Sequence, residues 1–238
     1  GMIESTFYSV LNYYKNVDLF LFQSEFTRDK FVEFGFDKSK TEIIENPMFN
    51  NFVPCYENKD YFLYFGRISF EKGIGDLLKA MKYLKKEKLI IVGDGPQKDE
   101  YEAFVEKNNI SKNVRFVGSK WGEELNKYIS NAKFIVLPSI WNDPNPLVIV
   151  QSYLFGKPVV GSDIGGISDL IDDNQTVLLF PPSNVNSLVE KIKKLYWDDN
   201  LIVEMGKNAE KKAINIHSPQ RYYMKTMQIF NSLLSSKN

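Results

Sequence analysis

Short apolar runs alternate with longer amphipathic stretches through most of this chain. Six apolar runs predict buried β-strands, at residues 61–65, 89–92, 114–117, 134–137, 158–160 and 176–180. The stretches between them predict helices near 73–84, 97–109, 122–131, 146–155 and 166–171. Buried strands that alternate with helices are typical of a parallel sheet covered on both faces. The pattern therefore predicts an α/β fold with a Rossmann-like, doubly wound parallel sheet.

Both ends of the chain are expected to add elements to this sheet. Before it, the pattern predicts a helix at 4–15, strands at 17–22 and 41–44, and between them a helix that Ser24 caps and Gly35 ends. The irregular stretch that follows, up to Asp60, is the best candidate for a linker. Beyond Pro182 the chain is expected to be helical, with helices at 184–197, 199–214 and 219–236.

Composition excludes several classes of protein. The 30 basic and 30 acidic residues cancel, so no global field attracts nucleic acid, and we expect no nucleic-acid partner. A single cysteine, Cys55, excludes an internal disulfide framework and suits a reducing compartment. No apolar run reaches the ~18 residues of a membrane span. The only histidine, His217, lies far in sequence from the motifs described below, which argues against a catalytic triad or a zinc site.

The most informative stretch, residues 138–171, leads from a strand end through a loop to a short apolar helix. It continues through another strand into a Gly-Gly turn. Asn145 is expected to cap the helix, Pro146 to occupy its first position and Gly156 to end it.

Two clusters of backbone amides are expected to converge in this stretch. The helix N-terminus leaves the amides of Leu147 and Val148 free, which makes an anion site. The turn at Gly165 and Gly166 can bring unobstructed backbone close to the same anion. Two such clusters suggest a diphosphate.

A second candidate for phosphate binding follows the first strand of the sheet, in the sequence GRISFEKG at 66–73. Arg67 has a planar fork suited to bidentate phosphate contacts, and Lys72 is a mobile point charge. The alternative is that both are ordinary solvated cations. Gly66 and Gly73 on either side of the pair, at a strand end, favour the phosphate site.

These two segments resemble the donor-site motifs of the retaining glycosyltransferases of family 4, which have the GT-B fold. One motif reads G-R-x-x-x-x-K-G, as at 66–73. The other has two acidic residues separated by seven, then G-x-P-V and S-D-x-G-G. Here its acidic positions are Asp143 and Gln151, followed by GKPV at 156–159 and SDIGG at 162–166. The spacing matches, but the second carboxylate is replaced by an amide.

The resemblance implies a role for each matching residue. Arg67 and Lys72 neutralise the donor diphosphate, and Asp143 faces the donor sugar near the reacting centre, unless it only forms a turn. Gln151 meets the ribose hydroxyls with one acceptor and one donor, unless neighbouring backbone satisfies a buried amide. The segment after the third strand lies against the base, or is a plain connection; its residues are Gly118, Ser119 and Lys120.

The resemblance also implies how the chain is organised. Residues 59–215 correspond to the nucleotide-sugar (donor) domain, and 1–58 to a remnant of the N-terminal acceptor half with its linker. Residues 216–238 correspond to a helix that crosses back toward that half. The four loops after the strands at 61–65, 114–117, 134–137 and 158–160 are expected to form one cleft at the carboxyl edge of the sheet.

The function that this resemblance implies is transfer of a sugar, with retention, from a nucleoside-diphosphate sugar. We expect no cofactor and no metal, and an acceptor that is a saccharide or a lipid-linked sugar in cell-surface polysaccharide or glycolipid synthesis. An N-terminal acceptor domain or a partner chain would complete the enzyme. The expected location is the cytoplasm, including the inner membrane surface.

Two alternatives remain open. Gln151 is also compatible with a non-catalytic sugar-nucleotide-binding or scaffolding subunit. A sugar-nucleotide epimerase of the same fold fits less well, because the R-x-x-x-x-K element belongs to transferases.

Overall fold

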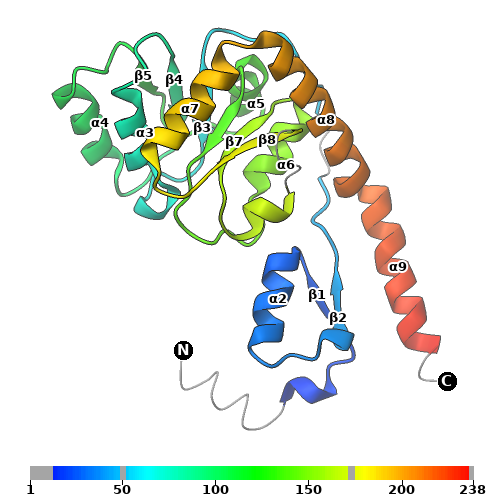
Figure 1. Ribbon diagram of the computed structural model, residues 1–238. Helices are drawn as coiled ribbons and strands as arrows, with labels where there is room; N and C mark the ends of the chain where they lie inside the picture. Colours follow the sequence, from blue (N-terminus) through cyan, green and yellow to red (C-terminus); the bar gives the residue numbers. More distant parts are fainter. Residues whose placement is uncertain (1–12, 49–51, 171–174, 236–238) are drawn as a thin grey trace.

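The computed structural model describes residues 13–48, 52–170 and 175–235 (Figure 1). Its strands are β1 (Phe20–Phe22), β2 (Thr41–Ile43), β3 (Phe62–Phe65), β4 (Leu89–Val92), β5 (Val114–Phe116), β6 (Ile135–Leu137), β7 (Val159–Ser162) and β8 (Val177–Phe180). Its α-helices are α2 (Glu25–Glu33), α3 (Ile74–Met81), α4 (Lys98–Lys107), α5 (Gly122–Asn131), α6 (Leu147–Leu154), α7 (Val185–Tyr196), α8 (Asp199–His217) and α9 (Pro219–Ser235). Short 3₁₀ helices are η1 (Tyr13–Asn16), η2 (Lys38–Lys40), η3 (Phe70–Lys72) and η4 (Gly165–Leu170).

Six parallel strands form the main sheet, in the order β5-β4-β3-β6-β7-β8. Successive residues of a strand point to opposite faces, and here both faces are buried. In β3, Phe62 and Tyr64 pack on the face that α3, α4 and α7 cover, whereas Leu63 and Phe65 pack on the face that α5 and α6 cover. The predicted doubly wound α/β fold is therefore confirmed.

The order of the strands reverses between β3 and β6. In a sheet of this kind, loops after neighbouring strands diverge at such a switch point and leave a crevice at the carboxyl edge. This is the edge at which the loops carrying the predicted motifs lie, because they follow β3, β5, β6 and β7. The topology therefore brings these motifs to one side of the molecule.

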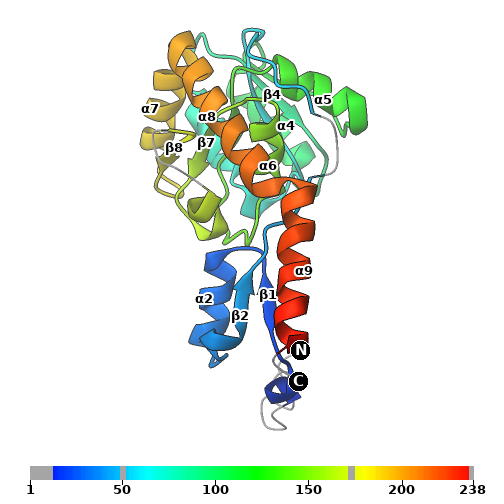
Figure 2. The same ribbon diagram turned by 90° about the vertical axis from the view of Figure 1, so that its right-hand side faces the viewer.

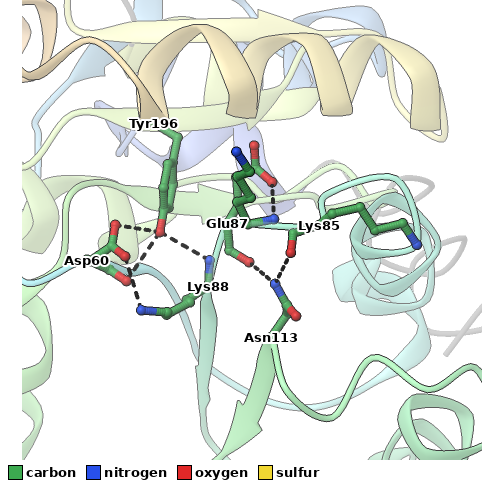
Figure 3. Close-up of polar contacts among 7 residues, drawn as sticks. Asp60, Lys85, Glu87, Lys88, Asn113 and Tyr196 are labelled. Carbon is green, nitrogen blue, oxygen red and sulfur yellow. Dashed lines mark hydrogen bonds and ion pairs between the residues drawn. The ribbon is translucent and has the colours of Figure 1, made fainter.

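The opposite, amino edge is held by a network of polar side chains around Tyr196, at the end of α7 (Figure 3). The Tyr196 hydroxyl donates to Asp60 Oδ1 at 2.7 Å and accepts from the backbone amide of Lys88 at 3.3 Å. This bond from Tyr196 is the main reason that the pKa of Asp60 is lowered. Asn113 donates to the carbonyls of Lys85 and Glu87. The network joins α7 to the starts of three strands and leaves the carboxyl edge to the motifs.

A smaller unit, β1–α2–β2, lies beyond the main body together with α9 (Figure 2). Its two strands are parallel. Ser24 caps α2, as predicted, by accepting from the amide of Thr27 at 3.2 Å. A second capping group, a carboxylate, comes from the main body, since Asp169 of η4 accepts from the amide of Phe26 at 2.6 Å. Asp169 thus caps a helix other than its own segment.

The connections between this unit and the main body run side by side. The amide of Met48 donates to the carbonyl of His217 at 3.0 Å, and His217 Nδ1 lies 2.8 Å from the carbonyl of Asn46. The His217 side chain is buried, which lowers its pKa. His217 therefore lies at the crossing between the two parts and not at the carboxyl edge.

Most predicted elements lie within two residues of their expected bounds. The helix expected at 166–171 is instead the 3₁₀ segment η4. The helix expected at 73–84 is α3, and a 3₁₀ turn that was not predicted, η3, precedes it. Most of the helix expected at 4–15 falls outside the described residues. None of the helices in the described ranges has the length and apolar character that a membrane crossing requires.

Candidate functional site

Among the described residues, two cavities can be located at the carboxyl edge of the sheet. The α6 cavity, of about 430 Å³, lies among the loops after β3, β4 and β5 and the first two turns of α6. The switch-point cavity, of about 420 Å³, lies between the loops after β3 and β6. The loops after β3, β5 and β6, three of the four predicted to form one cleft, line these cavities, whereas the loop after β7 lines neither of them.

Seven of the predicted site residues line the α6 cavity: Gly66, Arg67, Ser119, Lys120, Leu147, Val148 and Gln151. Its wall also includes Asp94, Trp121 and Leu125, which the motifs did not predict. Trp121 is 79% exposed at the rim. The sequence signal that could have identified Trp121 is an aromatic residue directly after the predicted site residues Ser119 and Lys120.

Close backbone contacts build the wall of this cavity. A Cβ atom on Gly93 would lie 1.9 Å from the carbonyl oxygen of Gly66, so the loops after β3 and β4 touch through their main chains. The amide of Gly93 donates to the carbonyl of Gly118 at 3.0 Å. Gly118 has a φ of +73°, which favours glycine. It thus supports the wall and does not line either cavity.

Arg67 is the cation most available to an anion in the α6 cavity. Its side chain is exposed, and among the described residues no side chain or backbone group pairs with its guanidinium. Lys120 is held by Glu124, with 2.6 Å between the ammonium nitrogen and a carboxylate oxygen, and the hydrogen bond to this carboxylate raises the pKa of Lys120. The cavity therefore combines one free guanidinium with an already paired lysine.

Lys72 and Asp143 form an ion pair across the switch-point cavity, with 2.9 Å between Lys72 Nζ and Asp143 Oδ2. Their side chains are 26% and 19% exposed. This places two of the predicted catalytic residues in direct contact. Because they belong to the loops after β3 and β6, the ion pair joins the two strands at which the sheet order reverses.

The rest of the switch-point cavity is lined by Glu71, Trp141 and Pro144. A hydrogen bond from the Ser69 hydroxyl is the main reason that the pKa of Glu71 is lowered, so Glu71 stays ionised. Trp141 is 63% exposed. This lining suits a polyhydroxylated ligand. The carboxylates of Glu71 and Asp143 can accept hydrogen bonds from hydroxyl groups, and the indole face of Trp141 can pack on C–H groups.

The α6 N-terminus differs from the prediction at Asn145. The helix begins at Leu147 and its N-cap is Pro146, with no capping hydrogen bond from a side chain. The first bond in the helix runs from the amide of Ile149 to the carbonyl of Pro146. Asn145 is therefore one residue too early to cap α6, and Pro146 precedes the first helical position. Pro146 lines neither cavity, whereas Leu147 and Val148 line the α6 cavity as predicted.

The Gly165-Gly166 turn also differs from the prediction. The amide of Gly166 donates to the carbonyl of Asp143 at 2.8 Å, so it is not free to bind an anion. A Cβ atom on Gly166 would lie 2.2 Å from the carbonyl oxygen of Pro144. The backbone that this turn approaches is that of the loop at 142–144. The turn supports that loop from behind, and its glycines are required by this close approach.

Gln151 is half-buried on the second turn of α6 and lines the α6 cavity. In the part of the chain that the structure describes, its amide makes no hydrogen bond with protein groups. Because Gln151 lines the cavity, water or a ligand in the cavity can supply the hydrogen bonds that its amide requires.

Comparison with known proteins gives a match to a family model described as Glycosyl transferases group 1, over residues 49–212. Among curated relatives, alpha-D-kanosaminyltransferase of Streptomyces kanamyceticus is 27% identical over 157 residues, which cover 64% of this chain and 40% of that enzyme. Glycogen synthase of Mycobacterium tuberculosis H37Rv is 28% identical over 172 residues, which cover 71% and 41%. The chain spans less than half the length of both enzymes.

Similar solved structures include sucrose-phosphate synthase from Thermosynechococcus elongatus, with a TM-score of 0.80 and 25% identity, covering 93% of this chain and 59% of that one. The Anabaena protein HepE, in complex with UDP and glucose, has a TM-score of 0.79 and 20% identity, with coverages of 90% and 63%. Both likenesses extend over most of the chain that the structure describes.

Proposed function

The chain belongs to the family Glycosyl transferases group 1, and we propose that it binds the nucleoside-diphosphate sugar of a retaining, family 4 transferase. The observation that carries this proposal is the lining of the α6 cavity. A free guanidinium at Arg67, the N-terminus of α6 and the amide of Gln151 face one space of about 430 Å³. These groups suit a diphosphate and a ribose.

In this proposal the ligand extends through both cavities. The base lies against Ser119, Lys120 and Trp121, and the ribose lies at Gln151. The diphosphate lies between Arg67 and the amides of Leu147 and Val148. The sugar reaches the switch-point cavity, where Asp143 and Lys72 meet it. Complexes of HepE with UDP and with UDP and glucose support a donor of this class by analogy of fold.

The proposed reaction is displacement of the diphosphate on the same face of the sugar that the acceptor attacks. Charge that develops on the leaving diphosphate is stabilised by Arg67, Lys72 and the helix amides, of which the amides are in place before the reaction. Lys72 must leave Asp143 to reach the diphosphate, and Asp143 is then free to accept from a sugar hydroxyl. Fixed cations and amides can supply this stabilisation without a metal ion.

The β1–α2–β2 unit fits a remnant of the acceptor half in this proposal, and α9 fits the helix that crosses back toward it. The acceptor would be a saccharide or a lipid-linked sugar, as in cell-surface polysaccharide or glycolipid synthesis. A non-catalytic, donor-binding subunit is the second candidate. It is favoured by one observation, the neutral Gln151 where the family has a carboxylate.

Calorimetry tests the ligand class. We expect one of UDP, GDP and ADP to bind, with the same affinity in the presence of Mg²⁺ and of EDTA. Tryptophan fluorescence gives a second readout. Trp121 lies at the α6 cavity and Trp141 at the switch-point cavity, whereas the indole N–H of Trp197 donates to Glu87 at the opposite edge of the sheet. Quenching that Trp121→Phe abolishes and Trp197→Phe preserves is expected. No binding of any of the three at millimolar concentration would contradict the proposal.

Gln151→Glu tests the ribose assignment. A carboxylate would accept from both ribose hydroxyls, and such charge-assisted bonds are about twice as strong as neutral ones. Affinity for the nucleoside diphosphate should rise, by about tenfold for ~1.4 kcal/mol, less the desolvation of the new charge.

The matching control is the 2′,3′-dideoxy nucleotide, for which this gain should disappear because the diol is absent. Tighter binding that persists with the dideoxy nucleotide would show that Gln151 does not face the ribose. A fall in melting temperature without a gain in affinity would show that the amide has protein partners.

A further inference from the structure

Asn145 is the one described residue whose side-chain polar atoms are all buried without a partner. The residue is 9% exposed, and neither Oδ1 nor Nδ2 makes a hydrogen bond. The other polar residues of the described ranges that are buried as whole residues are paired; for example, Ser152 donates to Val148, Ser162 to Leu137, and Lys157 to Glu57. Helix capping, the usual reason for an asparagine at this place, does not explain it, because Pro146 is the cap.

An unpaired buried amide destabilises the folded chain, since its hydrogen bonds with water are lost and not replaced. Each such group in a native protein therefore requires a reason, and a ligand that supplies the missing bonds is one. The amide needs both an acceptor for Nδ2 and a donor for Oδ1. Vicinal hydroxyl groups of a sugar supply both, whereas a phosphate supplies only acceptors.

The position of Asn145 along the chain fits such a ligand. On one side of it, Asp143 and Pro144 line the switch-point cavity; on the other, Leu147 and Val148 line the α6 cavity. Residues 145 and 146 are thus the link between the two linings. A molecule that occupies both cavities passes this link, at the place where its sugar follows its diphosphate.

We propose that Asn145 is a specificity-determining residue that binds vicinal hydroxyl groups of the transferred sugar. This rests on the proposed function and adds to it a residue outside the acidic positions of the motif. Asn145 lines neither cavity in the ligand-free chain, so this proposal requires its buried amide to change rotamer when the sugar enters. Asp143 can only accept hydrogen bonds, so Asn145 adds a donor that a carboxylate cannot offer.

The test compares each nucleoside diphosphate with its sugar form by calorimetry: UDP with UDP-glucose, GDP with GDP-mannose and ADP with ADP-glucose. For the pair that binds, the sugar form is expected to bind the wild-type chain more tightly. Asn145→Leu, which has the same number of heavy atoms, should lower the affinity for the sugar form about tenfold. It should leave the affinity for the nucleoside diphosphate unchanged.

Thermal melting distinguishes this role from a structural one, because loss of a structural hydrogen bond would lower the melting temperature. Because the replaced amide is unpaired, Asn145→Leu should melt at the wild-type temperature or roughly 2–4 °C above it. Asn145→Ala removes the same amide with a smaller group, in case leucine does not fit. The matched control is Gln97→Leu, since Gln97 Oε1 is the other buried atom without a partner. This control should leave the ratio of the two affinities unchanged.

The outcomes separate this inference from the proposed function. If no nucleotide binds the wild-type chain, the proposed function fails and this inference fails with it. If nucleotides bind but both Asn145 variants keep the wild-type ratio, only the inference is overturned. Equal loss of affinity for both members of a pair also overturns it, as does a large fall in melting temperature for both variants, which would reveal a protein partner for the amide.

Discussion

Arg67→Ala is expected to weaken binding of the nucleoside diphosphate by about 1–3 kcal/mol, or about 5- to 150-fold in Kd. The reason is that Arg67 lines the α6 cavity with a guanidinium that no described group pairs with, so its bonds to a diphosphate replace bonds to water. Bidentate, charge-assisted bonds are the strong class of hydrogen bond. Because the side chain is exposed, its removal should change the melting temperature little. Calorimetry and thermal melting measure the two effects.

Arg115→Ala is the matched control, since Arg115, on β5, is also an exposed arginine but lines neither cavity. It should leave the affinity unchanged. Unchanged binding in Arg67→Ala, together with a lower melting temperature, would mean that Arg67 is structural. A smaller effect is expected for Lys72→Ala, because Lys72 must first give up its 2.9 Å pairing with Asp143 before it can bind a phosphate.

Gly166→Ala is expected to reduce both stability and donor binding. The new methyl group would lie 2.2 Å from the carbonyl oxygen of Pro144, so the loop at 142–144 or the turn itself must shift. Overpacking of this kind costs about 1–3 kcal/mol, which corresponds to a fall in melting temperature of roughly 2–12 °C. The shift also moves Asp143 and the start of α6. Affinity for the sugar nucleotide should therefore fall about tenfold or more.

Gly75→Ala is the control for this substitution. Gly75 lies inside α3, and the atom nearest to its Cβ would be Tyr101 Oη at 3.5 Å, an ordinary contact. Alanine favours a helix more than glycine does, so this variant should melt at or above the wild-type temperature and bind normally. If Gly166→Ala behaved in the same way, the described packing of the turn against Pro144 would be wrong.

The main sheet could be predicted from the sequence because its physical cause is local. Strands buried on both faces must be apolar at nearly every position, as in LIIV at 89–92, and such runs are visible without knowledge of the fold. The positions that follow these strands could be predicted for the same reason. Once the sheet is parallel, every strand end that is followed by a helix lies on the carboxyl edge.

Details of the site depend on contacts between distant segments, and these could not be predicted. The capping role of Asn145 failed because it depends on which residue starts α6, and a difference of one residue changes the partner of the side chain. The role of Gly166 could not be predicted, because a glycine in a turn indicates that some backbone comes close but not which segment supplies it. The Lys72–Asp143 ion pair joins residues 71 positions apart, and the sequence around either residue does not indicate the other as its partner.

The two connections at His217 have a mechanical consequence. A single linker allows one part of a molecule to spin about it, whereas two linkers bonded to each other resist twisting. Here the chain crosses once at 46–48 and once at 217–219, and two hydrogen bonds tie the crossings together. The linker of the β1–α2–β2 unit is thus bonded to the second crossing, and rotation of the unit about its linker would break these two hydrogen bonds. The 2.6 Å hydrogen bond from the Phe26 amide to Asp169 joins the unit to η4 and adds a further restraint on the same rotation.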